Sequence, residues 1–264
     1  MDWHILGILL LVSAVLCSIG FYKHVYFLSI GYGFAIAGLG IALWILFGAG
    51  MDAVGIFSCI VLILYGVRLS GFLLYREYKN AAYRKTLKSV AKNENEMSFF
   101  AKAGIWVGVS LLYVAEVCPV FFRLSNHSSS VIVPVLGMII ALFGLAFETI
   151  ADRQKTKQKA ENPHMAAMKG LYKIVRCPNY YGEILFWTGI TISGLSSLQG
   201  IGQWLIVILE YVTIFGVMVS GAVRLEKRQN ANYGSNPQYQ AYIATTPILF
   251  PGIPLYTFVK ENQK

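Results

Sequence analysis

The sequence predicts an all-α, polytopic membrane protein with seven transmembrane helices. Of its 264 residues, 56% are hydrophobic and only 13% are charged, whereas about 25% of the residues in an ordinary soluble domain are charged. Seven apolar runs reach the length of about 20 residues that a helix needs to cross a bilayer. Because lipid offers the backbone no hydrogen-bond partners, these runs are expected to be helical. The composition excludes a disordered chain and a soluble globular domain.

The predicted helices follow one another along the chain with short connections. The first lacks the basic start and small-residue cleavage site of a signal peptide, so it is interpreted as a transmembrane helix. Gly200 must turn the chain between the last two helices, and the polar loop Lys79–Glu96 is expected to lie at the membrane surface as an amphipathic segment. The seven runs lie near Trp3–Phe21, Val25–Phe47, Ala53–Tyr75, Phe99–Phe122, Val131–Ile150, Tyr181–Leu198 and Ile201–Val223.

The positive charges predict the orientation of the chain in the membrane. All but two of the 22 Lys and Arg residues fall in the connections after the first, third and fifth predicted helices, at the adjoining start of the fourth (Lys102), or after the seventh. Arg68 lies inside the third predicted helix, and Arg123 falls on the opposite side. Because basic connections stay in the cytoplasm, the amino terminus is expected outside and the carboxyl terminus inside. Topology therefore accounts for the net charge of +9. Membrane lipids are expected partners, and nucleic acid is not.

Ionisable side chains within the apolar runs are candidate functional residues, because placing them at membrane depth is costly. Tyr65 and Arg68 lie three residues apart in the third predicted helix and so share one face. Glu116 lies within the fourth predicted helix. A structural pairing of Glu116 with Arg68 is the alternative to a functional role. For Glu210 in the last predicted helix, a structural hydrogen bond is favoured over catalysis.

Two further pairs of polar residues lie four positions apart, so that the members of each pair share a helix face. These pairs are Glu148 with Asp152, and Asn179 with Glu183. The carboxylates of Glu148 and Asp152 repel one another at this spacing unless hydrogen-bond donors lie between or beside them. Ribose hydroxyls, an amide or an arginine would serve. Pairing of the acids with basic residues at the same helix end is the structural alternative.

The region around Pro178 has the features of an anion site. Proline begins a helix well, because its missing N–H falls among donors that have no partner within the helix. Arg176 stands just before this helix start, where free N–H groups attract anions, so it is expected to hold a phosphate. The aromatic tail Arg224–Pro251 is expected to fold back over the helix ends as a lid, or to contact a bound nucleotide. The four cysteines fit neither a metal site nor a disulfide framework.

The segment from Gly170 to Trp187 resembles a known family. Its run Arg176-Cys177-Pro178-Asn179-Tyr180-Tyr181-Gly182-Glu183 is similar to the signature of the steroid 5α-reductase family, although many bacterial relatives carry His where this chain has Cys177. Phe147-Glu148 and Asp152-Arg153-Gln154-Lys155 resemble the family's second nucleotide-contacting stretch. The segments around Tyr65 and Glu116, together with the tail, extend the resemblance over roughly residues 60–255.

The resemblance implies a function. It implies NADPH as cofactor, bound in a cytoplasm-facing cavity, and reduction of the C=C bond of an α,β-unsaturated ketone. The substrate would be a lipophilic small molecule, steroid-like or another lipid, that enters from the bilayer. One membrane domain is expected over residues 1–264, with N-terminal helices in 1–52 and the cofactor-binding, reductase-like region in 53–264. A bacterial inner membrane is the expected location.

The resemblance also implies roles for individual residues. Tyr65 would donate a hydrogen bond to the substrate carbonyl and stabilise the negative charge that develops there. The family assists this Tyr with a Glu on an early helix. This chain has no embedded Glu before Tyr65, and Glu116 is the candidate replacement. The expected cofactor-binding residues are Arg68, Glu148, Asp152, Tyr172, Arg176, Asn179, Tyr180, Glu183, Arg224, Glu226, Arg228 and Tyr239.

Two other classes of function stay open. S-adenosylmethionine-dependent membrane methyltransferases of the isoprenylcysteine type share an Arg-x-Pro-x-Tyr-x-Gly segment and a carboxyl-terminal Glu. The two polar pairs favour a reductase, because nicotinamide and ribose offer more amide and hydroxyl partners. A non-enzymatic transporter or scaffold is the other alternative, since Arg68 and Glu116 would suit an ion path.

Overall fold

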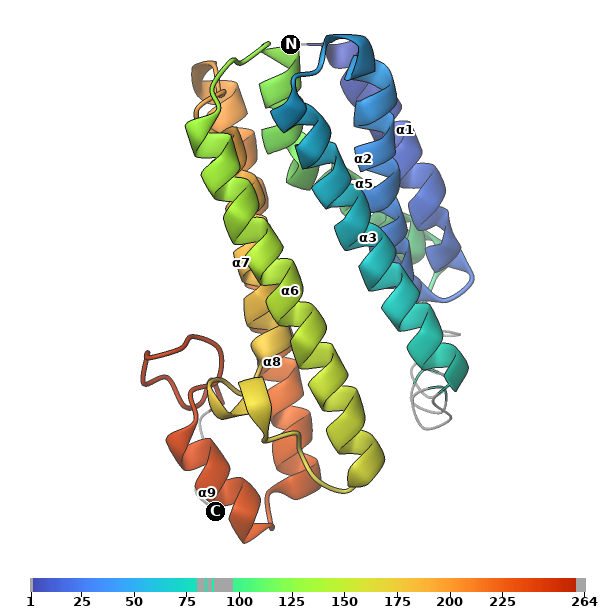
Figure 1. Ribbon diagram of the computed structural model, residues 1–264. Helices are drawn as coiled ribbons and strands as arrows, with labels where there is room; N and C mark the ends of the chain where they lie inside the picture. The colour runs from blue at the N-terminus through green and yellow to red at the C-terminus, as the bar shows by residue number, and fades with distance from the viewer. Residues whose placement is uncertain (1, 80–83, 85–86, 88–96, 260–264) are drawn as a thin grey trace. The chain divides into compact units, whose positions relative to one another are not determined.

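The structure of the protein is a computed structural model that describes residues 2–79, 84, 87 and 97–259 (Figure 1). Within these residues the regular structure is helical and contains no strand, which confirms the predicted all-α class. Short 3₁₀ turns lie at Ser18–Phe21, His24–Leu28, Gly48–Gly50 and Gly170–Lys173. The α-helices are α1 (Trp3–Cys17), α2 (Ile30–Phe47), α3 (Ala53–Lys79), α5 (Phe99–Ser125), α6 (Ile132–Glu161), α7 (Pro178–Leu195), α8 (Gly200–Tyr233) and α9 (Pro237–Thr245).

Six segments of the described chain are long and apolar enough to cross a membrane, where the sequence predicts seven. The predicted span Tyr181–Leu198 is helical, as α7, but it is not among the six. The first turns of α7 carry Asn179 and Glu183, which lower its apolar character. The count of seven and the orientation of the termini stay predictions. The six segments are Trp3–Phe21, Ile30–Gly50, Ala53–Lys79, Phe99–Ser125, Ile132–Glu161 and Gly200–Tyr233.

Several boundaries differ from the prediction. The second helix begins at Ile30, because His24–Leu28 forms a separate 3₁₀ turn. In this turn the Tyr26 hydroxyl donates to a carboxylate oxygen of Glu77 over 2.7 Å. The fifth predicted helix continues well past Ile150, and α8 continues well past Val223. The loop Lys79–Glu96, predicted to be amphipathic, lies outside the described residues except at Lys79, Arg84 and Leu87.

The helices form two compact units. Unit 1 comprises Met1–Met138 and Ile190–Glu210, and unit 2 comprises Ile139–Gly189 and Tyr211–Lys264. Each is described by itself. The prediction of a single membrane domain over residues 1–264 stays a prediction.

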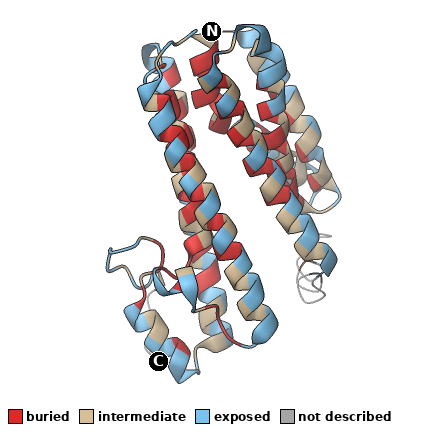
Figure 2. Ribbon diagram, in the orientation of Figure 1, coloured by how far each residue is buried: buried red, intermediate tan, exposed pale blue. Residues whose placement is uncertain are grey.

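Unit 1 is a bundle of α1, α2, α3 and α5, with buried residues on the faces that the helices turn toward one another (Figure 2). Glycines bring α2 and α3 into backbone contact. A Cβ added at Gly66 would lie 2.3 Å from the carbonyl oxygen of Gly33. Close approach through small residues is how helices associate in lipid, where no hydrophobic force drives them together. The Ser70 hydroxyl donates to the Ile30 carbonyl across the same contact, over 2.8 Å.

Unit 2 contains parts of α6, α7 and α8, together with α9 and the tail. Here α6 and α7 meet through Gly144 and Gly182. A Cβ added at Gly182 would lie 2.7 Å from the backbone nitrogen of Glu148, and one added at Gly144 would lie 2.4 Å from the nitrogen of Phe186. As the numbers rise by four along α6 they fall by four along α7, so the two helices run antiparallel.

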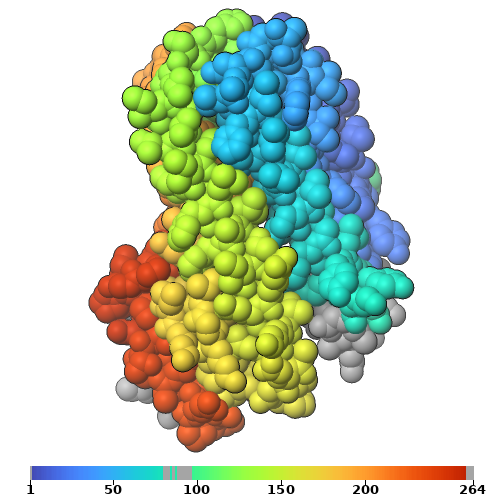
Figure 3. Space-filling view, viewed as in Figure 1, coloured from blue at the N-terminus to red at the C-terminus, as the bar shows by residue number. Residues whose placement is uncertain are grey.

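Two glutamines on α6 hold the loop that leads into the 3₁₀ turn at Gly170. The side-chain carbonyl of Gln158 accepts from the backbone N–H groups of Met168 and Lys169, at 2.9 and 2.8 Å. The side chain of Gln154 accepts from the N–H of Leu171 over 2.8 Å. Gly170 has a φ of +69°, and a Cβ there would lie 2.3 Å from Gln154 Oε1, so the position requires glycine. This loop and α9 form part of the surface of unit 2 (Figure 3).

The tail after α8 folds onto unit 2 instead of extending as a free coil, as predicted. Asn236 caps α9 by accepting from the N–H groups of Gln238 and Tyr239, at 2.9 and 3.3 Å. Beyond α9, Ile248 and Leu249 are fully buried. The carbonyls of Pro247 and Ile248 accept from the backbone N–H groups of Arg176 and Cys177, so the tail lies beside the segment that contains Arg176.

Candidate functional site

The contact between α6 and α7 brings the two predicted polar pairs to one crossing. Glu148 lies opposite Gly182, and the antiparallel register places Asp152 one turn further along α6, opposite the start of α7. Glu148, Asp152 and Glu183 are 3%, 7% and 8% exposed. Three carboxylates are therefore concentrated in the interior of unit 2. Buried carboxylates need hydrogen-bond donors or cations nearby.

The segment from Tyr172 to Asn179 contains buried polar atoms that have no hydrogen-bond partner among the described residues. These atoms are the Tyr172 hydroxyl, the Asn179 Oδ1 atom, and the Nε and Nη1 atoms of Arg176. Burial, and next the charge of Asp152, raise the pKa of Tyr172 well above its usual range, so its hydroxyl stays a donor. Most buried polar groups in native proteins are satisfied. This concentration of exceptions indicates where a polar ligand would fit.

Arg176 and Glu226, both predicted to bind cofactor, form an ion pair with each other. The Nη2 atom of Arg176 lies 2.8 Å from Glu226 Oε1, and the two side chains are 1% and 2% exposed. The same nitrogen donates to the carbonyl of Tyr256. The other oxygen of Glu226 accepts from the N–H of Phe258 over 2.9 Å. The Nη2 atom of Arg176 therefore already has its hydrogen-bond partners within the protein.

Arg224 and Arg228 lie exposed on one face of α8. Arg224 donates to the Ser220 hydroxyl over 2.8 Å. The ring of Tyr180 packs beside Gly221, where an added Cβ would lie 3.2 Å from it. Both arginines are close enough to Tyr180 for their charges to act on its hydroxyl. They form a basic, accessible edge next to the start of α7.

Tyr239 and Cys177 complete the surroundings of Arg176. The Tyr239 side chain is buried, and its hydroxyl donates to Asn230 Oδ1 over 2.7 Å. Burial raises the pKa of Tyr239 to about 12, although the charge of Arg176 acts in the opposite direction. Burial likewise raises the pKa of Cys177 to about 12. The thiol therefore stays protonated at neutral pH and is unsuited to nucleophilic chemistry.

The predicted catalytic residues Tyr65 and Glu116 lie in unit 1, and both are fully buried. The Tyr65 hydroxyl donates to the hydroxyl of Tyr32 over 3.1 Å. The ring of Tyr32 stacks on Tyr113, with centroids 4.7 Å apart, and the Tyr113 hydroxyl donates to the carbonyl of Phe27. Sequence reasoning missed Tyr32, because an isolated Tyr in an apolar run carries no signal of its own.

Arg68 lies one turn from Tyr65 on α3 and is half-buried. Its guanidinium lies 5.6 Å from the centre of the Phe72 ring, and that of Arg76 lies 5.5 Å from the same ring. Arg68, Phe72 and Arg76 therefore share one face of α3. Such cation–π contacts stabilise a cation near lipid.

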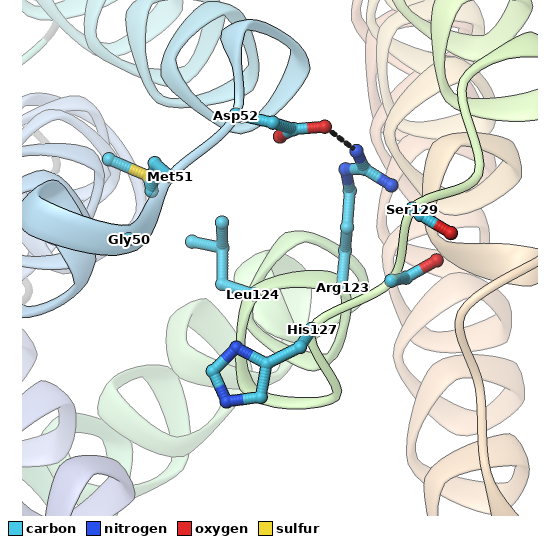
Figure 4. Close-up of a pocket in the computed structure, with 8 residues that line it drawn as sticks. Gly50, Met51, Asp52, Arg123, Leu124, His127 and Ser129 are labelled. Atoms are coloured by element: carbon cyan, nitrogen blue, oxygen red, sulfur yellow. Dashed lines mark hydrogen bonds and ion pairs between the residues drawn. The ribbon is translucent and has the colours of Figure 1, made fainter.

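A separate polar cavity of about 280 Å³ lies where α3 begins and α5 ends (Figure 4). Beside it the Nη2 atom of Arg123 and a carboxylate oxygen of Asp52 form an ion pair of 2.5 Å, and His127, Ser128 and Ser129 also line the space. None of the predicted site residues lines this cavity. Among the described residues, no cluster of His, Cys, Asp and Glu suitable for a metal ion is found.

Together, the helices and the buried polar cluster define a class: a helical membrane protein with a candidate ligand site in unit 2. Residues 22–246 match the family described as "Protein of unknown function (DUF1295)", and the chain belongs to this family. It is also similar to the protein "Steroid 5-alpha-reductase DET2" of Arabidopsis thaliana, with 33% identity over 73 residues. The match confirms the predicted resemblance to steroid 5α-reductases. It covers 27% of this chain and 28% of that relative. No solved structure matches the chain.

Proposed function

We propose that the protein is a membrane-embedded reductase that uses NADPH to reduce the C=C bond of an α,β-unsaturated ketone in a lipophilic substrate. The observation that carries the proposal is the set of partnerless buried polar atoms on Tyr172, Arg176 and Asn179. They occur in the segment whose sequence resembles the steroid 5α-reductase signature. Coarser support comes from the similarity to a steroid 5α-reductase and from the apolar helices, which suit a substrate dissolved in lipid.

The residues of unit 2 fit the polar parts of NADPH. Asn179 Oδ1 has no partner among the described residues and would accept from the nicotinamide carboxamide. Asp152 and Glu183 would accept from ribose hydroxyls. Arg224 and Arg228 would hold phosphates, because an arginine matches the geometry of a phosphate group and keeps its charge. When bound, NADPH supplies the hydride that adds to the β-carbon of the substrate.

Tyr65 would act on the substrate carbonyl. Its hydroxyl is a donor held in a dry interior, where it bonds Tyr32. A donor aimed at the carbonyl oxygen stabilises the negative charge that grows there during reduction, and this effect is large where water is excluded. Glu116 would assist Tyr65 from α5. The substrate would enter from the bilayer, and a bacterial inner membrane is the proposed location.

Ligand-dependent unfolding of the detergent-purified protein tests the proposal. NADPH is expected to raise the melting temperature, because a ligand that binds only the folded state stabilises it, by about 2.7 kcal/mol at a hundredfold excess over Kd. S-adenosylmethionine at equal concentration serves as the competing probe. A rise with S-adenosylmethionine and none with NADPH would favour a methyltransferase and refute the reductase. No rise with either would support a transporter or scaffold.

A further inference from the structure

The tail segment Pro247–Phe258, here called the strap, is anchored at both ends to the same small region of unit 2. At its start, the carbonyls of Pro247 and Ile248 accept from the backbone N–H groups of Arg176 and Cys177, at 2.8 and 2.9 Å. At its end, the carbonyl of Tyr256 accepts from the Arg176 side chain. The N–H of Phe258 donates to Glu226 over 2.9 Å.

Aromatic contacts pack the middle of the strap against unit 2. The ring of Phe250 stacks on Phe215 with centroids 6.0 Å apart, and it meets the ring of Tyr181 edge-on at 6.2 Å. The strap also bonds to itself, since the N–H of Ile248 donates to the carbonyl of Leu255 over 2.8 Å. It is therefore a folded element and not a loose end.

The Arg176–Glu226 ion pair links the strap to the interior of unit 2. Both side chains are almost fully buried, so removal of either partner leaves an uncompensated charge in the interior. Arg176 binds the strap through its backbone and its side chain, and Glu226 binds it through the second carboxylate oxygen. Breaking the pair would release the end of the strap, where the two side chains bond Tyr256 and Phe258.

The position of the strap bears on access to the candidate site. The Tyr172 hydroxyl and Asn179 Oδ1 have no partner among the described residues, yet they are buried. A ligand cannot reach them unless a covering element moves. The strap is hydrogen-bonded to Arg176 and Cys177. These two residues lie between Tyr172 and Asn179 in the sequence. Unlike α6, α7 or α8, it can open without separating transmembrane helices.

We propose that the strap is a lid over the cofactor site and that the Arg176–Glu226 pair is the latch that holds it closed. Arg176 is then a positioning residue for the strap, and Arg224 and Arg228 bind the phosphates of the cofactor. Opening of the strap precedes entry of the nucleotide, and closing follows it. The lid role rests on the proposed function, whereas the latch does not.

Hydrogen exchange followed by mass spectrometry tests the latch without any ligand. Glu226→Gln removes the charge and keeps the size of the side chain. Exchange in peptides of the strap is expected to rise by about tenfold or more, because local opening sets the exchange rate, while peptides of α9 stay unchanged. Glu161→Gln, the same change at an exposed position, is the matched control and should leave the strap as it is.

A second variant keeps the buried charges intact. Phe258→Pro removes the backbone N–H that donates to Glu226, together with the half-buried Phe258 ring, so it loosens the strap even where Glu226→Gln fails to fold. Unchanged strap exchange in the folded variants would overturn the latch.

Binding kinetics with NADPH then test the lid. Faster NADPH association in the variants that loosen the strap supports it, because opening would limit entry. Equal association rates in the variants and the natural protein would overturn the lid while the latch stands. Absence of NADPH binding to the natural protein would refute the proposed function and the lid together, and the exchange result would still decide the latch.

Discussion

The tyrosine cluster of unit 1 and the segment from Tyr172 to Asn179 of unit 2 differ in whether their buried polar atoms have hydrogen-bond partners. In the tyrosine cluster of unit 1, Tyr65 donates to Tyr32 and Tyr113 donates to a backbone carbonyl. In unit 2, the Tyr172 hydroxyl and Asn179 Oδ1 have no partner within the described chain. A satisfied network rigidifies a core, whereas partnerless polar groups are costly. The contrast indicates that the hydroxyls of the tyrosine cluster already have partners within the protein, whereas the segment from Tyr172 to Asn179 has donors and acceptors to offer a ligand.

Both units use the same device to pack helices. Gly33 and Gly66 bring α2 and α3 into contact in unit 1, and Gly144 and Gly182 do the same for α6 and α7 in unit 2. The neighbours differ, because the contact in unit 1 is flanked by Ser70, whereas that in unit 2 is flanked by the backbone and Cβ of Glu148. Close helix packing therefore serves the bundle in one unit and gathers acids in the other.

The largest expected effect comes from separating the helices. Gly182→Ala places a Cβ 2.7 Å from the Glu148 nitrogen, and Gly66→Ala places one 2.3 Å from the Gly33 oxygen. Each should lower the free energy of unfolding by roughly 1–3 kcal/mol, as overpacking does, in thermal unfolding measurements. Only Gly182→Ala should also remove the stabilisation by NADPH. Gly216→Ala, where the Cβ meets open space, is the control. If NADPH stabilised the Gly182 variant fully, the crossing of α6 and α7 would not be the cofactor site.

The second prediction concerns a single hydrogen-bond acceptor, Asn179 Oδ1, and its effect on NADPH affinity. Asn179→Ala should weaken NADPH binding by roughly two- to twelvefold, the equivalent of one hydrogen bond of about 0.5–1.5 kcal/mol, with little change in the melting temperature of the unliganded protein. Titration followed by intrinsic fluorescence measures the affinity. Asn232→Ala, at an exposed position on α8, should leave it unchanged. Equal affinity in the two variants would remove Asn179 from the site.

The smallest effect compares two tyrosines directly. Tyr65→Phe removes a donor that bonds Tyr32, so the unliganded protein should lose about 1 kcal/mol of stability. Tyr172→Phe removes a buried hydroxyl without a partner among the described residues, so the unliganded protein should keep its stability or gain a little. Chemical unfolding of both variants provides the comparison. A loss of stability in Tyr172→Phe equal to that in Tyr65→Phe would show that the two hydroxyls are equally satisfied and would erase the contrast between the units.

Much of the fold follows from the sequence, because hydropathy and helix start signals are local. The apolar runs predict the helices, and the start of α7 at Pro178 is predicted from the missing N–H of proline. The polar pairs Glu148 with Asp152 and Asn179 with Glu183 are likewise visible as spacing. The ends of α6 and α8 were not predictable in this way, since both helices run on through polar sequence.

Only the tertiary structure decided which of these residues meet. The pairing of Arg176 with Glu226, fifty residues apart, and the contact of Tyr65 with Tyr32 depend on how helices pack. So does the register that sets Gly182 against Glu148. The sequence by itself determined a helical membrane protein and the polar positions along it. The tertiary structure decided that Arg176 holds the strap, because the partner of a buried charge depends on packing between distant segments and not on neighbours in the chain.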